Sequence, residues 1–374
     1  MTAHDESLGP EGYQVDAVEA WIDANVEALK PPFKWTRLEG GHSNLTYQLE
    51  DQSGQLAVIR RPPQGELLPK AHDMSREWAL ISALGPTDVP VPEAYGFCES
   101  PDVTGAWFYV MGHINGKPLY NSDDTNAIVP APERRKMAFN FIDVLAALHS
   151  VDPDGVGLGD LGKRDSYVGR QLKTWYRSWT SSIEDADFDD PRAHELQAFF
   201  LNNLPDQGPI RIVHGDYAPH NILIGPDCLI HAVVDWEIST LGDPLADLAY
   251  ALNPWPDPTD PEPPLPEAAL APPGFPTRTE LAARYGEVSG RDLSNLDYYI
   301  AFNRWKSAAI IHGVYGRYRV GKKSTEGIDM DEMRERIGRS LDLAELAANR
   351  LNYGWSRLLL RFKLPLRPFL RASL

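Results

Sequence analysis

The first third of the chain combines stretches of helical period with several short stretches of strand period. The first helical stretch precedes Pro31 and carries an apolar stripe of Val15, Val18, Ile22, Val26 and Leu29. Segments with the composition of strands follow at residues 35–39, 44–49, 55–60, 93–98 and 107–111. A second helical stripe over residues 75–84 interrupts this series. The pattern predicts a small sheet with one helix before it and one inserted into it.

The pattern becomes mainly helical after Pro130. A buried helix that ends near His149 is indicated by the stripe of Met137, Phe141, Leu145 and Leu148. Residues 167–182 predict another helix, and their aromatic side chains are typical of a core. Apolar stripes within 301–315 and 333–351 predict two final helices. We therefore expect a large helical part after the sheet.

Two segments of this helical part carry no helical pattern. The acidic run at 184–190 is typical of a solvated loop. Residues 253–276 contain ten prolines, which exclude a long helix or a central strand. This proline-rich segment is either a surface connector or a loop that faces a substrate, and the sequence favours the two equally.

The densest group of polar residues lies between short apolar segments at 210–235. Residues 210–213 are typical of a buried strand, and the loop after them contains Asp216 and Asn221. Two further strand segments joined by a Gly-Pro-Asp turn predict a hairpin that starts after Asn221 and ends before Asp235. Asn221 and Asp235 should therefore both lie beside Asp216.

Two acids and an amide at one end of a hairpin are what a magnesium–nucleotide site requires. Mg²⁺ takes hard oxygen ligands and is usually held by one or two side chains together with phosphates. Asn221 and Asp235 fit the two ligand positions. Asp216 is then left to accept, or at least to orient, a hydroxyl proton during phosphate transfer.

The order of these residues resembles the catalytic loop of the protein-kinase-like aminoglycoside and choline phosphotransferases. His214-Gly215-Asp216 is followed by Asn221 and, nineteen positions after Asp216, by Asp235. Trp236 and Glu237 stand where protein kinases have Phe-Gly, which is usual in the small-molecule branch. The resemblance implies an α+β, two-lobed, protein-kinase-like fold. We expect a small nucleotide-binding lobe on an antiparallel sheet at 1–115 and a larger, mainly helical catalytic and substrate lobe at 116–354.

The resemblance also implies which residues bind ATP. Gly41, Ser43 and Asn44 lie at the tip of the first hairpin, which would cover the phosphates unless it is only a tight turn. Arg60 occupies the strand position where a kinase carries its phosphate-binding Lys, and Lys70 is a further candidate nearby.

The other nucleotide contacts come from the inserted helix and from the segment between the lobes. Glu77 is the expected partner of the basic residue at position 60, although an exposed helix Glu is commoner in general. Met111 and Ile114 are the candidate apolar walls for adenine. Asp243 and Asp247 resemble the segment after the metal Asp, and we interpret them as structural residues that cap a helix or brace a loop.

Within the superfamily the chain is most similar to phosphotransferases related to the kinase-like domains of acyl-CoA dehydrogenase fusion proteins. The segments that carry this similarity include IRRPP, AHDMSREW and DWEISTLGDPLADLAY. It implies ATP- and Mg²⁺-dependent phosphorylation of a hydroxyl group on a small molecule, for which a hydroxyacyl-CoA is one candidate. An aminoglycoside or a choline-like amino alcohol is the alternative acceptor.

Two other function classes are a catalytically silent binding module and a protein kinase. Arg60 and Gly112 depart from the family pattern and favour a catalytically silent binding module, whereas Asp216, Asn221 and Asp235 oppose it. A protein kinase is disfavoured because the chain has no segment from Asp-Phe-Gly to Ala-Pro-Glu that would dock a peptide.

Composition and charge indicate which classes of partner and which cellular compartment to expect. The chain has 374 residues and a formal net charge of −17, which argues against nucleic acid as a partner. Two cysteines, Cys98 and Cys228, cannot form a disulfide framework, and the polar N-terminus has no apolar signal region. We therefore expect a cytoplasmic protein. The oligomeric state is left open.

The last stretch, residues 355–374, is basic and apolar, unlike the acidic remainder of the chain. Such a tail can lie on an anionic membrane surface. We favour the alternative that it packs across the acidic body of its own chain.

Overall fold

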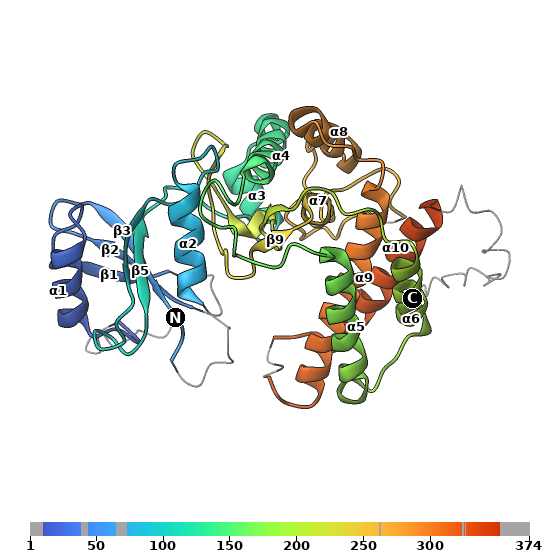
Figure 1. Cartoon of the computed structure of the whole chain (residues 1–374), viewed down its shortest axis with the longest axis horizontal. Helices are drawn as coiled ribbons and strands as arrows, with labels where there is room; N and C mark the ends of the chain where they lie inside the picture. The colour runs from blue at the N-terminus through green and yellow to red at the C-terminus, as the bar shows by residue number, and fades with distance from the viewer. Residues whose placement is uncertain are drawn as a thin grey trace, which may run out of the picture. The chain divides into compact units, whose positions relative to one another are not determined.

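The structure is a computed structural model that describes residues 10–38, 44–64, 73–261, 263–323, 325 and 327–351. An antiparallel sheet forms the N-terminal part, and the remainder is mainly helical (Figure 1). This is the predicted α+β composition. Gly41, Ser43, Lys70 and the basic tail lie outside the described residues. Among the described helices, none combines the length and the apolar character that a membrane span requires.

The N-terminal sheet has five strands in the order β1-β2-β3-β5-β4, and all neighbours are antiparallel. The strands are β1 (Lys34–Arg37), β2 (Leu45–Glu50), β3 (Leu56–Arg61), β4 (Ala94–Cys98) and β5 (Phe108–Gly112). Helix α1 (Val15–Asn25) precedes the sheet, and α2 (Met74–Leu84) is inserted between β3 and β4. The predicted order of elements is therefore confirmed for this part.

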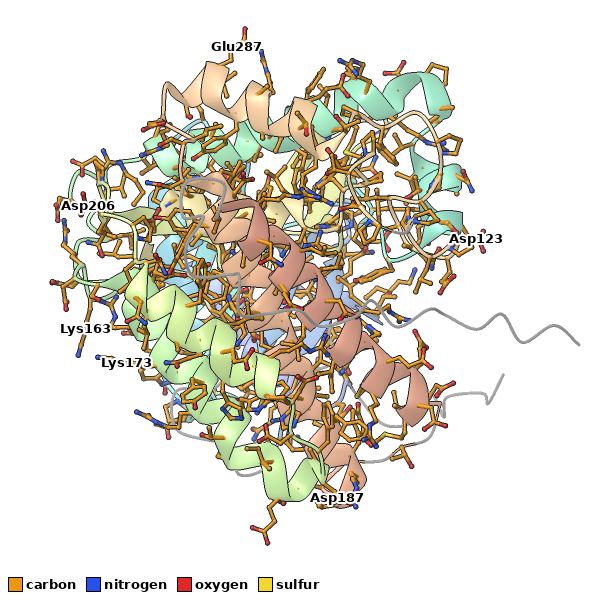
Figure 2. The ribbon with its side chains drawn as sticks, turned by 90° about the vertical axis from the view of Figure 1, so that its right-hand side faces the viewer. Asp123, Lys163, Lys173, Asp187, Asp206 and Glu287 are labelled. Atoms are coloured by element: carbon orange, nitrogen blue, oxygen red, sulfur yellow. The ribbon has the colours of Figure 1, made fainter. Side chains whose placement is uncertain are left out.

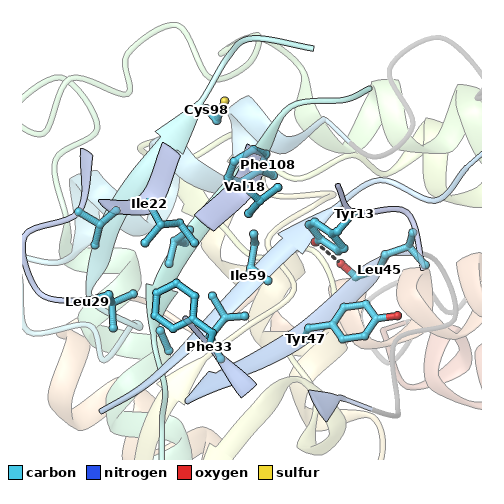
Figure 3. Packing of buried hydrophobic residues seen from close by; sticks show 14 residues of the cluster. Tyr13, Val18, Ile22, Leu29, Phe33, Leu45, Tyr47, Ile59, Cys98 and Phe108 are labelled. Atoms are coloured by element: carbon cyan, nitrogen blue, oxygen red, sulfur yellow. Dashed lines mark hydrogen bonds between the residues drawn. The ribbon is translucent and has the colours of Figure 1, made fainter. Parts of the chain in front are cut away.

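The two helices lie on opposite faces of the sheet, because neighbouring residues of a strand point to opposite sides. Val18 and Ile22 of α1 pack on a face that includes Ile59 and Phe108 (Figure 3). Tyr109, the next residue of β5, points to the other face and donates a hydrogen bond to Glu77 of α2. The face toward α2 therefore carries polar groups, while the face toward α1 is an apolar core.

The N-terminal sheet belongs to a compact unit formed by residues 1–165 and 207–292. Among its described residues, this unit also contains four further helices and two small sheets. The helices are α3 (Ser122–Ile128), α4 (Arg134–Ser150), α7 (Pro244–Leu252) and α8 (Arg278–Ser289). The strands are β6 (Arg211–Val213), β7 (Ile222–Ile224), β8 (Ile230–Val233) and β9 (Thr240–Gly242). β7 pairs with β8 as the predicted hairpin, and β6 pairs with β9. Two 3₁₀ turns, η1 (Ala131–Glu133) and η2 (Pro219–Asn221), lie between these elements.

The second compact unit comprises residues 166–206 and 293–374. Its helices are α5 (Tyr167–Ala186), α6 (Pro191–Asn202), α9 (Leu296–Arg319) and α10 (Met330–Leu351). Buried aromatic residues fill this bundle, and the ring of His312 stacks on that of Trp179 with their centres 4.0 Å apart. The aromatic residues of α5 therefore include core residues, as expected. The lobe boundary that we predict at residue 115 stays a proposal.

The predicted end of one helix needs correction. Helix α5 continues past Ser182 to Ala186, so Glu184 and Asp185, expected in a loop, lie in its last turn. The helix ends only where Asp187 adopts the left-handed conformation, with φ of 51°. An acidic run is compatible with helix, and its polarity alone did not distinguish a loop from an exposed helix end.

Helices α3, α6, α7 and α8 and strand β9 were not predicted. Pro191 and Pro244 are the first residues of α6 and α7, and each follows an Asp that caps the helix. Proline is favoured at the first helical position because its missing N–H has no partner there. These prolines therefore begin helices. The proline-rich segment 253–276 contains neither helix nor strand among its described residues, in agreement with the prediction.

The segment after β5 is held against the β7–β8 hairpin. The backbone of Lys117 exchanges two hydrogen bonds of 3.0 Å with that of Ile224 in β7. Gly116 lies so close to β7 that an added Cβ would stand 3.0 Å from the Cβ of Leu223 and 3.2 Å from the carbonyl oxygen of Ile224. A side chain at this position would therefore crowd the backbone of β7.

We predict that Gly116→Ala destabilises the protein by about 1–3 kcal/mol, because the backbone of β7 is fixed by its pairing and cannot move away. Gly208→Ala is the matched control, since an added Cβ there meets nothing within 4 Å. Urea unfolding of both variants measures the difference. A Gly116→Ala protein as stable as the control would show that the linker and hairpin are not tightly packed.

Candidate active site

The predicted catalytic loop is fixed through its backbone by a buried carboxylate on α7. Asp247 accepts hydrogen bonds of 2.8 Å from the backbone N–H groups of His214 and Gly215. It also contacts His149, whose other ring nitrogen is hydrogen-bonded to Tyr285. Burial opposes the charge on Asp247, yet the contact with His149 lowers the pKa of the carboxyl. The interpretation of Asp247 as a bracing residue agrees with this geometry, and Asp243 caps α7 as expected.

The loop can turn here because Gly215 adopts a left-handed conformation, with φ of +84°. His214 is fully buried, and its imidazole Nε2 donates to the carbonyl oxygen of Val234, 3.0 Å away. The Nδ1 atom of the same ring accepts a bond from the backbone N–H of Asp216. The histidine therefore connects the loop to the end of the hairpin, which places Asp216 next to the exit of β8.

Asp216 and Asn221 are in direct contact. The side-chain amide of Asn221 donates to the backbone oxygen and to Oδ2 of Asp216, with both distances 2.9 Å. Among the described residues, no hydrogen-bond donor approaches the amide oxygen of Asn221. The amide nitrogen is thus committed to the carboxylate, and the amide oxygen is the atom that could face a cation.

Asp235 lies two residues after the end of β8, one residue further from the strand than predicted, and has a positive φ of 65°. Its neighbour Val234 donates a backbone hydrogen bond of 3.0 Å to the carbonyl oxygen of Asn221. The entrance and the exit of the hairpin are therefore joined through the backbone. The left-handed conformation, which is uncommon for a residue with a side chain, turns the chain sharply at Asp235.

Arg60 bridges Asp235 and Glu77. Its Nη2 lies 2.9 Å from Oδ1 of Asp235, and its Nε lies 3.3 Å from Oε2 of Glu77. The side chain of Glu77 is only 1% exposed, and that of Arg60 is 13% exposed. The predicted pairing of Arg60 with Glu77 is thus present, and the alternative of an exposed helix Glu is excluded. Arg61 points the other way and donates to the backbone oxygen of Thr104, 2.7 Å away.

Glu77 is satisfied by two further donors. The phenol of Tyr109 lies 2.8 Å from Oε2, and the amide of Asn44 lies 3.4 Å from Oε1. Burial raises the pKa of Glu77, and the charge of Arg60 works against that shift. Burial likewise disfavours the charge on Arg60, but the carboxylate of Glu77 and its other neighbours raise the pKa of the guanidinium overall. Arg60 is therefore a permanent cation at this position.

Three carboxylates converge at this point. Glu77, Asp235 and Glu237 each offer an oxygen, and these oxygens lie within 4.8 Å of one another. Carboxylate and amide oxygens are the ligands that Mg²⁺ prefers. The oxygen donors of Asn221 and Asp235 are of the type that suits a magnesium ion, and Asp235 also lies beside Glu237, an acid that was not among the predicted ligands.

The structure places the remaining predicted nucleotide contacts as follows. Asn44 lies just before β2 and is buried against Glu77, so it belongs to the ionic cluster. Met111 lies on β5 and Ile114 in the segment after it, and both are partly buried. Their roles as walls for adenine stay predictions, as do those of Gly41 and Ser43, which are not among the described residues.

Two side chains that contact Asp216 were not predicted. The phenol of Tyr250 on α7 donates to Oδ1, and Nε2 of His220 lies 3.6 Å from Oδ2. Burial raises the pKa of Asp216, but the contacts with His220 and Tyr250 outweigh it and lower the pKa. The available signal was helical spacing, because Tyr250 comes three residues after Asp247 and so shares its face of the helix.

Comparison with known proteins agrees with this geometry. Residues 34–281 match the model of the family described as "Phosphotransferase enzyme family". Acyl-CoA dehydrogenase family member 11 of Gallus gallus is 36% identical over 298 residues, which cover 76% of this chain and 37% of that protein. The chain thus spans less than half the length of this curated relative.

Solved structures give the same result. A Ralstonia eutropha protein assigned to the aminoglycoside phosphotransferases superposes with a TM-score of 0.77 at 28% identity, over 90% of this chain and 99% of that one. A spectinomycin phosphotransferase solved with ADP and spectinomycin shares the fold, with a TM-score of 0.58 at 13% identity over 90% and 99% of the two chains. The protein-kinase-like fold class is therefore confirmed. With a family match over most of its length, the chain belongs to the phosphotransferase enzyme family that includes the aminoglycoside phosphotransferases.

Proposed function

We propose that the protein is an ATP- and Mg²⁺-dependent small-molecule kinase that transfers phosphate to a hydroxyl group. The observation that carries this proposal is the continuous set of contacts from Asp216 through Asn221 to the hairpin exit at Asp235, and on through Arg60 to Glu77. An acid beside a carboxamide oxygen, next to a second acid and a fixed cation, is the set of groups that phosphoryl transfer uses.

Asp216 is the group that meets the acceptor. It takes the proton of the acceptor hydroxyl while the hydroxyl oxygen bonds to the γ-phosphorus of ATP. The bond between that phosphorus and the β–γ bridging oxygen breaks, which releases ADP. The carboxylate is 30% exposed, so an acceptor can reach it, and its lowered pKa keeps it in the ionised form that accepts a proton.

Asn221 and Asp235 hold the metal in this proposal. A bound Mg²⁺ would neutralise charge on the phosphates. Asp235 is paired with Arg60 in the structure, so its carboxylate must turn from the guanidinium toward the metal when the site is loaded. Arg60 keeps Glu77 as its second partner and would then direct the N–H donor that now contacts Asp235 at a phosphate oxygen.

The acceptor is proposed from the relatives. The protein from Gallus gallus is named an acyl-CoA dehydrogenase family member, and this chain matches 37% of it. A phosphotransferase domain that shares a chain with an acyl-CoA enzyme supports a hydroxyacyl-CoA as the acceptor. An aminoglycoside or a choline-like amino alcohol is the alternative, and the assignment of the Ralstonia eutropha protein supports the aminoglycoside.

A catalytically silent binding module is the second candidate function. The contact that favours it is the pairing of Arg60 with Asp235, since the guanidinium neutralises a carboxylate that a metal would need. The two functions differ in whether Mg-ATP binds through Asp235 and in whether phosphate is released, and each difference can be measured.

We predict that Mg-ATP at about 100 times its dissociation constant stabilises the protein by about 2.7 kcal/mol, and that Asp235→Ala removes this effect. Asp206→Ala is the control for loss of one acidic charge, because the side chain of Asp206 is exposed (Figure 2). Thermal unfolding with and without Mg-ATP measures the shift. An Asp235→Ala protein that keeps the full shift would place the metal elsewhere.

We predict that purified protein hydrolyses ATP slowly without an acceptor and that Asp216→Ala lowers this rate by about 10²–10⁴-fold, because the variant lacks the proton acceptor. The Mg-ATP stabilisation of this variant should persist, since Asp216 is not proposed as a metal ligand. Phosphate release measured by a coupled assay tests the rate. Equal rates in both proteins would remove Asp216 from the reaction, and no hydrolysis in the unchanged protein would favour the silent module.

We predict that hydroxyacyl-CoAs are phosphorylated with a higher kcat/KM than aminoglycosides or amino alcohols. Transfer of radiolabelled γ-phosphate from ATP to each class measures the preference. Acyl-CoAs that lack the hydroxyl are the matched controls and should gain no label. Preferential labelling of an amine-containing acceptor would reverse the assignment while leaving the phosphotransferase activity intact.

A further inference from the structure

Helix α7 contacts the catalytic loop at two points through one of its faces. Asp247 holds the backbone N–H groups of His214 and Gly215. Three residues later, the phenol of Tyr250 donates to Oδ1 of Asp216. Residues three apart lie side by side on a helix. A single rigid element therefore fixes both the backbone of the loop and the side chain of its acid.

The two carboxylate oxygens of Asp216 accept hydrogen bonds from two different residues. Oδ2 accepts the amide N–H of Asn221, and Oδ1 accepts the phenol of Tyr250. Rotation about the bond to a carboxylate group is soft, and one hydrogen bond leaves this rotation largely free. Donors on both oxygens fix the plane of the carboxylate. Without Tyr250, only Oδ2, which accepts the hydrogen bond from Asn221, would be fixed.

The phenol of Tyr250 acts toward Asp216 as a hydrogen-bond donor. Burial raises the pKa of Tyr250 well above the ordinary range, and the neighbouring Asp216 carboxylate adds to this shift. The other charged or titratable groups that bear on the pair are His220 and His214 on the loop and Asp247 on the helix. Tyr250 therefore keeps its proton and continues to direct it at Asp216.

The contact is specific to Tyr250 and does not follow from mere proximity of a phenol. Tyr217, the residue adjacent to Asp216 in the chain, is fully buried, but its hydroxyl donates to the backbone oxygen of Phe141, 2.9 Å away. Two buried phenols thus lie next to the loop, and only the one on α7 serves the carboxylate. Tyr217 supplies a matched comparison.

We propose that Tyr250 is a positioning residue of the phosphotransfer reaction, which holds the Asp216 carboxylate in the orientation that accepts the hydroxyl proton. This inference rests on the proposed function, because it assigns Tyr250 a role in that reaction. The acceptor oxygen must meet both the carboxylate and the γ-phosphorus in line, and small errors in such an alignment are costly to the rate.

Kinetics of Tyr250→Phe give the first test. We expect the kcat for phosphate transfer to fall about tenfold or more, with the KM for Mg-ATP unchanged, because the substitution frees the acid and leaves the metal ligands in place. Tyr217→Phe should lower stability without this selective loss of kcat. A Tyr250→Phe enzyme with unchanged kcat, or with kcat and the KM for Mg-ATP altered together, would overturn the inference.

A double-variant cycle gives the second test and needs no acceptor. In the unchanged protein, Tyr250→Phe should raise the fraction unfolded about tenfold, the effect of one hydrogen bond to a charged group. In the Asp216→Ala background the same substitution should have almost no further effect. Tyr217→Phe should cost the same in both backgrounds, because its partner is Phe141.

The outcomes separate the inference from the proposed function. Equal costs of Tyr250→Phe in both backgrounds would show that the phenol does not act through Asp216, which overturns the inference alone. A chain that neither transfers phosphate to any acceptor nor hydrolyses ATP would overturn the proposed function and the inference with it.

Discussion

A carboxylate withdrawn from water requires a cation and hydrogen-bond donors beside it, and the buried Glu77 imposes this requirement on the N-terminal sheet. Arg60 of β3 supplies the cation, while Tyr109 and Asn44 supply donors. Because Arg60 also reaches Asp235, one guanidinium ties the sheet, helix α2 and the exit of the catalytic hairpin together. The position of Asp235, the proposed metal ligand, therefore depends on Arg60, the same residue that neutralises the buried Glu77.

A second buried carboxylate, that of Asp247, fixes the predicted catalytic loop. Asp247 holds two backbone N–H groups, and Tyr250 on the same helical face holds the side chain of Asp216. The proposed acid is thus oriented by α7, while the proposed metal ligands are oriented by the hairpin and by Arg60. The support of the proposed acid and that of the proposed metal ligands meet through Asn221 and through His214.

The parts of the site that are close in sequence could be predicted, and those brought together by helix placement could not. Asn221 and Asp235 flank one hairpin, so local pairing alone brings them together. The pairing of Arg60 with Glu77, although it depends on how α2 is placed, could be predicted from the family resemblance together with the order of strand and helix. Tyr250 was missed because it lies 34 residues from Asp216 in the chain, on a helix that was not predicted. Its contact depends on how α7 packs, which hydrophobic spacing does not reveal.

The most direct test of the account is a crystal structure of the protein with Mn²⁺ and a non-hydrolysable ATP analogue, with the metal located by anomalous scattering. Mn²⁺ shares the preference of Mg²⁺ for oxygen ligands. The account predicts an anomalous peak within coordination distance of the Asn221 amide oxygen and the Asp235 carboxylate, with Arg60 turned from Asp235 toward the phosphates. A peak elsewhere, or a nucleotide bound while Arg60 still pairs with Asp235, would contradict it.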